Sequence, residues 1–155
     1  MASVSSPTQI ALPTLIRGFD AALGRFQAAA AERDAEAAFH PLFEALAWTY
    51  SIDDRLNKPD LPALRGLRWA RRKVHHQWAD ALYVADVAHV ISARRPAIMG
   101  PHFFEWRWRP ELARGRERDN ADRNAYREHL SDQPARTTLA SVSEFLAPQR
   151  VTVAE

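Results

Sequence analysis

Apolar residues recur at intervals of three and four along most of this 155-residue chain. This spacing places them on one side of an α-helix, whereas a half-buried strand would need an apolar residue at every second position. The clearest run of this kind consists of Leu12, Leu15, Ile16, Phe19, Leu23 and Phe26. The pattern therefore predicts a mainly helical fold.

Residues typical of helix ends divide this pattern into segments. Pro13 fits the first turn of the first helix, where a missing N–H costs little, and Asp34 is a suitable N-cap for the second. Pro41 can kink or restart the second helix. Asp60 is expected to cap a third helix, with Pro62 in its first turn.

The third helix is predicted to be long. Its apolar pattern runs from Leu64 to Val90, with room for a bend after Gln77, and the Arg94-Arg95-Pro96 segment should end it, because the residue before a proline avoids the helical conformation. Two more helices are expected, one over residues 117–130 and one after Pro134 that carries Leu139, Val142, Phe145 and Leu146.

The segment 97–118 differs from its surroundings. Residues 102–109 alternate partly as a strand would, between the turn signal Gly100-Pro101 and the strand-breaking Pro110. The sequence thus predicts an all-α bundle of four to five helices with an aromatic-rich loop or short extended insertion. We expect one domain over residues 9–147, because 155 residues are too few for two ordinary domains, with flexible tails at 1–8 and 148–155.

Composition excludes several kinds of chemistry. The chain has no cysteine, which excludes disulfides, thiolate metal sites and cysteine nucleophiles and is typical of the reducing cytoplasm. No apolar run approaches the roughly 18 residues of a membrane span. The net charge of +2 does not by itself indicate nucleic acid. Lys58 and Lys73 are the only lysines, however, so the cations are almost all arginine, which binds phosphate bidentately; a GC-rich genome gives the same bias.

Arginine and histidine gather in the segment 64–78 in a way that packing does not require. Arg71 and His75 fall close to the apolar side of the predicted helix, and a charge that points toward a core needs a reason. A neutral imidazole can take a proton from a ribose 2′-hydroxyl or give one to a leaving 5′-oxygen, and a guanidinium can stabilise charge on the phosphate. These residue types are sufficient for RNA cleavage without a metal.

The segment Arg71-Arg72-Lys73-Val74-His75-His76 resembles the signature of the HEPN superfamily of helical-bundle ribonucleases and toxins, in which four to six residues separate an arginine from a histidine. The resemblance implies that Arg71 and His76 are catalytic in an endoribonuclease that needs neither metal nor cofactor. It also implies an RNA substrate, a homodimer with facing sites, and a role in toxin–antitoxin or phage-defence systems, where an antitoxin can be a protein partner.

Other pairings in this segment stay open. Arg68 and His75, with six residues between them, also satisfy the signature, and Arg72 and His76 lie four residues apart on one helical face. Arg71 and His76 would lie about 140° apart around an ideal helix and would need a bend or an interface to converge. Members of the superfamily commonly have a polar residue, often asparagine, after the arginine, where this chain has Arg72.

Asp53, near the end of the second helix, is the candidate supporting residue. It could orient a site histidine or pair with Arg71, and a simple ion pair between two helices is the favoured interpretation. Trp69 and Trp78 are expected in the core.

Further basic and aromatic residues could bind RNA or a protein partner: Arg68, Arg72, Lys73, Trp106, Arg107 and Arg109. Aromatics interleaved with arginines suit stacking on unpaired bases and contact with phosphates, but a partner surface fits as well and is favoured. The histidines at 40, 89, 102 and 129 lack metal-ligand spacing, so no metal site is expected. The competing function is a non-catalytic helical interaction module, such as an antitoxin, accessory subunit or scaffold, whose arginines and histidines form salt bridges between helices.

Overall fold

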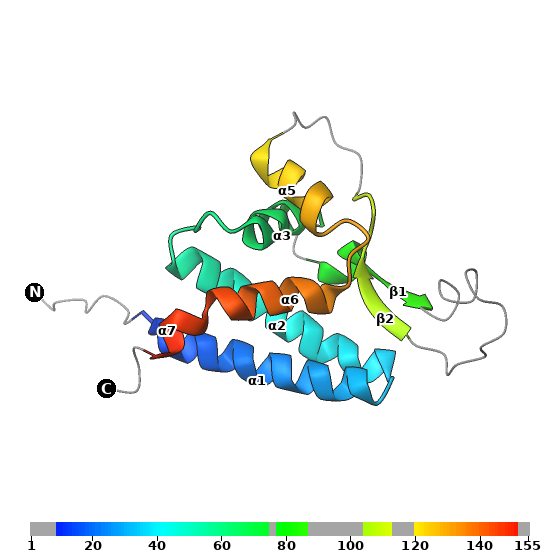
Figure 1. The fold of residues 1–155 in the computed structure, drawn as a ribbon, viewed down its shortest axis with the longest axis horizontal. Coiled ribbons are helices and arrows are strands. Elements are labelled where there is room, and N and C mark those ends of the chain that lie inside the picture. The colour runs from blue at the N-terminus through cyan, green and yellow to red at the C-terminus, as the bar shows by residue number, and fades with distance from the viewer. Residues whose placement is uncertain (1–8, 75–76, 87–103, 113–119, 152–155) are drawn as a thin grey trace, which may run out of the picture.

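The structure, a computed structural model, describes residues 9–74, 77–86, 104–112 and 120–151 and shows an all-α helical bundle with one small β-hairpin (Figure 1). Its described elements are α1 (Leu12–Ala31), α2 (Ala35–Arg55), α3 (Pro62–Lys73), the 3₁₀ turn η1 (Trp78–Ala81), β1 (Leu82–Asp86), β2 (Phe104–Trp108), α5 (Ala121–His129), α6 (Ala135–Phe145) and α7 (Ala147–Val151).

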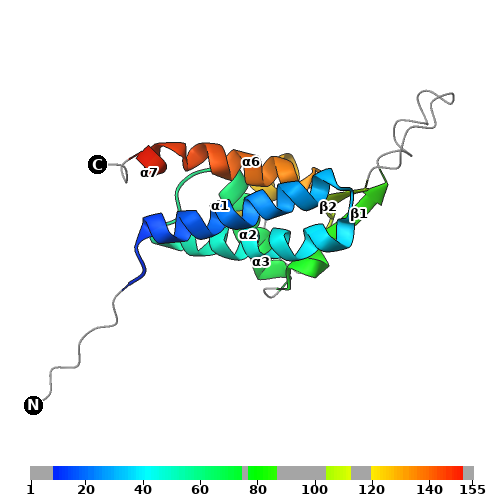
Figure 2. The same cartoon turned by 90° about the horizontal axis from the view of Figure 1, so that it is seen from below.

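Helices α1 and α2 form an antiparallel hairpin, and α6 runs along it (Figures 1 and 2). Helix α3 packs against α5, and the β-hairpin lies near the connection between α1 and α2. Residues 148–151 were expected in a flexible tail, but they belong to α7. There Arg150 contacts both carboxylate oxygens of Asp20 in α1, at 2.9 and 2.5 Å, and this contact ties the C-terminal helix to the first one.

One hydrophobic core joins the helices to the hairpin. Trp108 of β2 is completely buried, and its indole N–H donates to the Thr138 hydroxyl of α6 at 2.8 Å. Its ring lies 6.0 Å from that of Trp78 and 6.4 Å from that of Tyr126. Trp69 and Trp78 are both buried, as predicted. The aromatic side chains therefore connect α3, η1, β2 and α5 in one packed unit.

Most of the predicted helix ends are confirmed. Asp34 caps α2 by accepting the Ala37 N–H at 2.9 Å, and Pro13 and Pro62 lie in the first turns of α1 and α3. Helix α2 continues through Pro41 without restarting. The prediction for Asp60 is wrong, because Leu61 is the N-cap of α3.

The prediction of a long third helix is also wrong. Helix α3 ends at Lys73, and residues 78–86, which were expected to continue it, form η1 and β1 instead. The expected end signal Arg94-Arg95-Pro96 lies outside the described residues. Leu82 and Trp78 still reach the core, but Leu82 does so from a strand that pairs with β2, opposite Trp108. Cross-strand contacts with an aromatic strand outweigh the local helical pattern here. The three cations Arg71, Arg72 and Lys73 at the helix C-terminus are a typical end signal.

The extended insertion is confirmed within the described residues. Residues 104–108 form β2, which pairs antiparallel with β1. In the described residues the fourth predicted helix is α5, which begins at Ala121 after the N-cap Asn120, whose side chain accepts the Arg123 N–H at 2.9 Å. Residues 117–119 of the prediction lie outside the described residues. None of the helices in the described part of the chain is long and apolar enough to cross a membrane.

Candidate functional site

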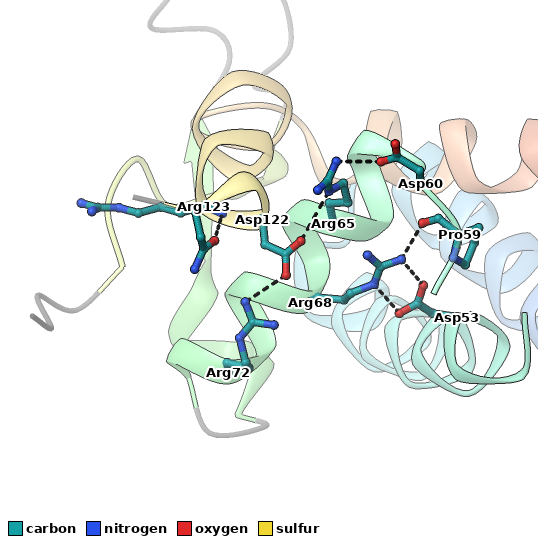
Figure 3. Close-up of polar contacts among 9 residues, drawn as sticks. Asp53, Pro59, Asp60, Arg65, Arg68, Arg72, Asp122 and Arg123 are labelled. Atoms are coloured by element: carbon teal, nitrogen blue, oxygen red, sulfur yellow. Dashed lines mark hydrogen bonds and ion pairs between the residues drawn. The ribbon is translucent and has the colours of Figure 1, made fainter. Parts of the chain in front are cut away.

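The arginine-rich face of α3 is held to α2 by one nearly buried ion pair (Figure 3). The Nε and Nη2 atoms of Arg68 donate to the two carboxylate oxygens of Asp53, each at 2.8 Å. The same Nη2 donates to the Pro59 carbonyl at 2.6 Å. The side chains of Asp53 and Arg68 are 5% and 14% exposed. The hydrogen bonds that Arg68 donates to Asp53 raise the pKa of Arg68 above its usual value, although burial opposes this shift.

The ion pair between two helices expected for Asp53 is thus present, but it joins Asp53 to Arg68 and not to Arg71. Both carboxylate oxygens accept from one guanidinium in the bidentate geometry typical of strong pairs. This arrangement gives Arg68 a structural role. It also weakens the case for Arg68 with His75 as the functional pair, since the Nε and Nη2 donors of Arg68 already have partners.

Arg71 lies one helical turn further along α3 and has a different environment. Its guanidinium carbon lies 3.1 Å from the centroid of the Tyr50 ring, which comes from α2. Among the residues that the structure describes, no carboxylate is within ion-pair distance of Arg71. The Tyr50 side chain is 39% exposed, so this stacked pair lies at the surface.

The other arginines on this part of α3 point toward α5. Asp122, in the first turn of α5, accepts from Arg72 at 3.0 Å and lies 3.5 Å from the Nε of Arg65 (Figure 3). Arg65 also binds Asp60 at 2.7 Å. Both arginines therefore connect helices, although the exposure of Arg72 makes its pair a weak source of stability.

The two candidate histidines, His75 and His76, lie outside the described residues. Helix α3 ends at Lys73 with Val74 as its C-cap, so the angle of about 140° for an ideal helix cannot be applied to Arg71 and His76. Lys73, the last residue of α3, contacts the helix itself: its Nζ lies 5.9 Å from the Trp69 ring centroid.

The hollow beside Arg71 is small. Its volume is about 10 Å³, which is room for about one water molecule. It is lined by Leu46, Thr49, Tyr50, Asp53, Leu64, Leu67, Arg68, Arg71 and Trp78. This hollow is therefore too small for a substrate molecule.

The binding residues expected in the insertion are largely used within the fold. The Trp106 indole N–H donates to the Ala35 carbonyl at 2.7 Å, and its ring lies 5.0 Å from that of Phe39. Arg107 is only a quarter exposed and lies 3.4 Å from Glu105. These contacts assign Trp106 and Arg107 to hairpin packing.

Arg109 is exposed, but its backbone is fixed. Its N–H donates to Ala81, and its carbonyl accepts the Tyr126 hydroxyl at 2.6 Å. Of the three residues predicted in the insertion, Trp106, Arg107 and Arg109, Arg109 is the one with an exposed side chain.

A separate groove of about 800 Å³ lies between the α1–α2 connection, β2 and α6. Phe26, Ala30 and Ala38 contribute apolar lining, and an ion pair of 2.6 Å between Glu105 and Arg136 stands at its edge. The groove contains none of the residues of the arginine–histidine segment. The described residues contain no cluster of three or more histidine, aspartate or glutamate side chains that could hold a metal ion.

Two residues of this site, Tyr50 and Asp122, are not among those predicted from the sequence. The available signal for Tyr50 was its spacing, because Tyr50 and Asp53 are three residues apart, as are Arg68 and Arg71. No comparable signal pointed to Asp122, which is 50 residues from Arg72 in the chain.

Comparison with known proteins does not place the chain in a family. No protein-family model, no curated protein and no solved structure matches it at a significant level.

Proposed function

We propose that this protein is a metal-independent endoribonuclease of the HEPN type, in which Arg71 binds the scissile phosphate and His76 transfers protons. The observation that carries the proposal is the environment of Arg71. Arg65, Arg68 and Arg72 each pair with a carboxylate, whereas the Arg71 guanidinium lies on an exposed ring with no such partner among the described residues.

The chemistry follows from the RNA backbone. When the ribose 2′-oxygen attacks phosphorus, the 2′-hydroxyl loses a proton, the 5′-oxygen leaves with one, and a cyclic 2′,3′-phosphate remains. An imidazole can serve in either proton transfer, and a guanidinium stabilises the negative charge that develops on the phosphate oxygens. In this scheme Asp53 holds α3 in place through Arg68, and His75 is the alternative proton-transfer group.

A homodimer is part of the proposal. Two large apolar side chains on α2, Phe43 and Tyr50, are 40% and 39% exposed and lie seven residues apart, on one face of the helix. Exposed apolar side chains on one face are typical of a surface that binds another protein. A second copy with two-fold symmetry would cover this face and place two Arg71 side chains close together. We assign the activity to toxin–antitoxin or phage-defence systems, with an antitoxin as a possible protein partner.

The test is RNA cleavage in buffer that contains a chelator. The parent protein is expected to cut an RNA oligonucleotide and to leave the DNA oligonucleotide of the same sequence intact, since DNA lacks the 2′-hydroxyl. His76→Ala should lower the rate at least about 100-fold, the usual size of a general acid–base contribution. His129→Ala, which changes a half-exposed histidine on α5, is the matched control and should keep the parent rate. The proposal fails if folded, dimeric His76→Ala cuts RNA as fast as the parent.

A specific observation supports the second candidate, a non-catalytic interaction module. Three of the four arginines of α3 form ion pairs, to Asp60, Asp53 and Asp122, as expected for cations that serve to connect helices. In this case neither the parent nor His75→Ala and His76→Ala would cut RNA, and all three would bind the same protein partner. The cleavage assay distinguishes the two candidates directly.

A further inference from the structure

Two contacts of different kinds join α2 to α3 at the same spacing. Asp53 pairs with Arg68, and Tyr50 stacks under Arg71. Each helix contributes residues three positions apart, and the order along α2 is the reverse of the order along α3. The two contacts are therefore successive and lie along one line between two helices that run in opposite directions.

The first contact fixes the position of the second. Arg68 is held by both oxygens of Asp53 and by the Pro59 carbonyl, so α3 has little freedom to slide along or rotate against α2. Arg71 follows within one turn of the helix. Its side chain consequently lies over the Tyr50 ring.

Stacking orients a guanidinium without using its hydrogen-bond donors. The N–H groups of arginine all lie in the plane of the guanidinium, and an aromatic ring contacts the face of that plane. A carboxylate would instead occupy two donors along one edge, as Asp53 does with Arg68. The contact with Tyr50 thus holds Arg71 in place and leaves its donor edges available, which is what bidentate binding of a phosphate requires.

We propose that Tyr50 is the positioning residue of the site: its ring holds the Arg71 guanidinium in the orientation that binds an RNA backbone phosphate. This inference rests on the proposed phosphate-binding role of Arg71. Tyr50 acts through Arg71 and makes no contact with the reacting atoms, so it is not a catalytic residue.

The first test is a double-mutant cycle on RNA binding. The probe is a fluorescein-labelled ten-nucleotide RNA in which every 2′-hydroxyl is methylated, so that it cannot be cleaved by attack of the 2′-oxygen. Tyr50→Leu should weaken binding about tenfold, and Tyr50→Phe, which keeps the ring, should stay close to the parent. In the Arg71→Ala background Tyr50→Leu should change binding less than about twofold. Val84→Ala, which truncates an exposed apolar side chain on β1, is the control and should bind as the parent does.

The second test observes the stacking directly. In ¹⁵N-labelled protein the Arg71 side-chain N–H signals should show a ring-current shift that persists in Tyr50→Phe and is lost in Tyr50→Leu. Additive effects of Tyr50→Leu and Arg71→Ala on binding, Arg71 signals that Tyr50→Leu does not change, or a parent protein that does not bind the probe would each overturn the inference. If binding and spectra behave as expected while RNA is not cut, the inference stands and the proposed ribonuclease activity fails.

Discussion

Replacing Asp53 by asparagine tests whether the ion pair to Arg68 holds the site together. The substitution keeps the size of the side chain and one acceptor oxygen, but it removes the negative charge and one of the two acceptors. Arg68, 14% exposed, would then keep only the Pro59 carbonyl and one amide oxygen as partners. A nearly buried cation would be left without a counter-charge.

The magnitude follows from this burial. Removal of one partner from a buried ion pair costs about 3–5 kcal/mol, because the remaining charge is neither solvated nor paired. Asparagine retains one hydrogen bond, so we expect Asp53→Asn to lower the free energy of unfolding by about 2–3 kcal/mol. For a chain of this size the corresponding decrease in Tm is about 4–12 °C.

Urea and thermal unfolding measure this loss, and the chain provides a matched control. Asp60 pairs with Arg65 at 2.7 Å, but its side chain is 82% exposed, so Asp60→Asn should cost less than about 1 kcal/mol. The double variant Asp53→Leu/Arg68→Met replaces both charges with apolar groups and should recover most of the stability. The reasoning is refuted if Asp53→Asn costs no more than Asp60→Asn, or if the double variant is as unstable as the single one.

Two further predictions concern the α3–α5 interface and its tyrosine. A Cβ at Gly66 would meet the Tyr126 backbone at 3.1 Å and the Leu130 side chain at 2.7 Å, so Gly66→Ala should lower the free energy of unfolding in urea by about 1–3 kcal/mol. A Cβ at Gly24 would meet no atom within 4 Å, so Gly24→Ala should raise it by about 0.5–1 kcal/mol. Equal effects of the two substitutions would contradict this explanation. Burial raises the pKa of Tyr126, so above about pH 10 the folded state binds more protons than the unfolded chain. The contribution of Tyr126 to the free energy of unfolding is therefore complete below about pH 10 and is lost as the pH rises above it. Titration at 295 nm should show two tyrosines that ionise above the ordinary range, because the hydrogen bond to Asp132 also raises the pKa of Tyr83. Tyr126→Phe should remove one of them, and a Tyr126 that ionises at its usual pKa would contradict the prediction.

Local sequence signals predicted the helices that depend on local interactions. The spacing from Leu12 to Phe26 gave α1, and Asp34 marked the start of α2 because a capping bond forms within a few residues. Leu82 shows where such signals fail, since its neighbours fit a helical pattern, but the decisive partner is Trp108 on a strand that lies beyond residues 87–103. No local pattern reports a contact of that sequence separation.

The site shows the same division. The sequence identified Asp53 as a residue for an inter-helix ion pair and placed Arg71 within an arginine-rich helix. It named Arg71 as a partner for Asp53, whereas Asp53 binds Arg68, because that choice depends on how α3 rotates against α2 and is set partly by the Pro59 carbonyl. His75 and His76 lie outside the described residues, so their assignment to catalysis remains a prediction from the motif.

The equal spacing of the two α2–α3 contacts limits how the length of this chain can change. One residue inserted between Tyr50 and Asp53, or between Arg68 and Arg71, would rotate one contact by about 100° relative to the other, and only one of the two could survive. Insertions elsewhere in the chain leave both three-residue intervals unchanged. Chains that descend from the same ancestor and keep this site should therefore vary in length outside these two short intervals, however far their sequences have diverged.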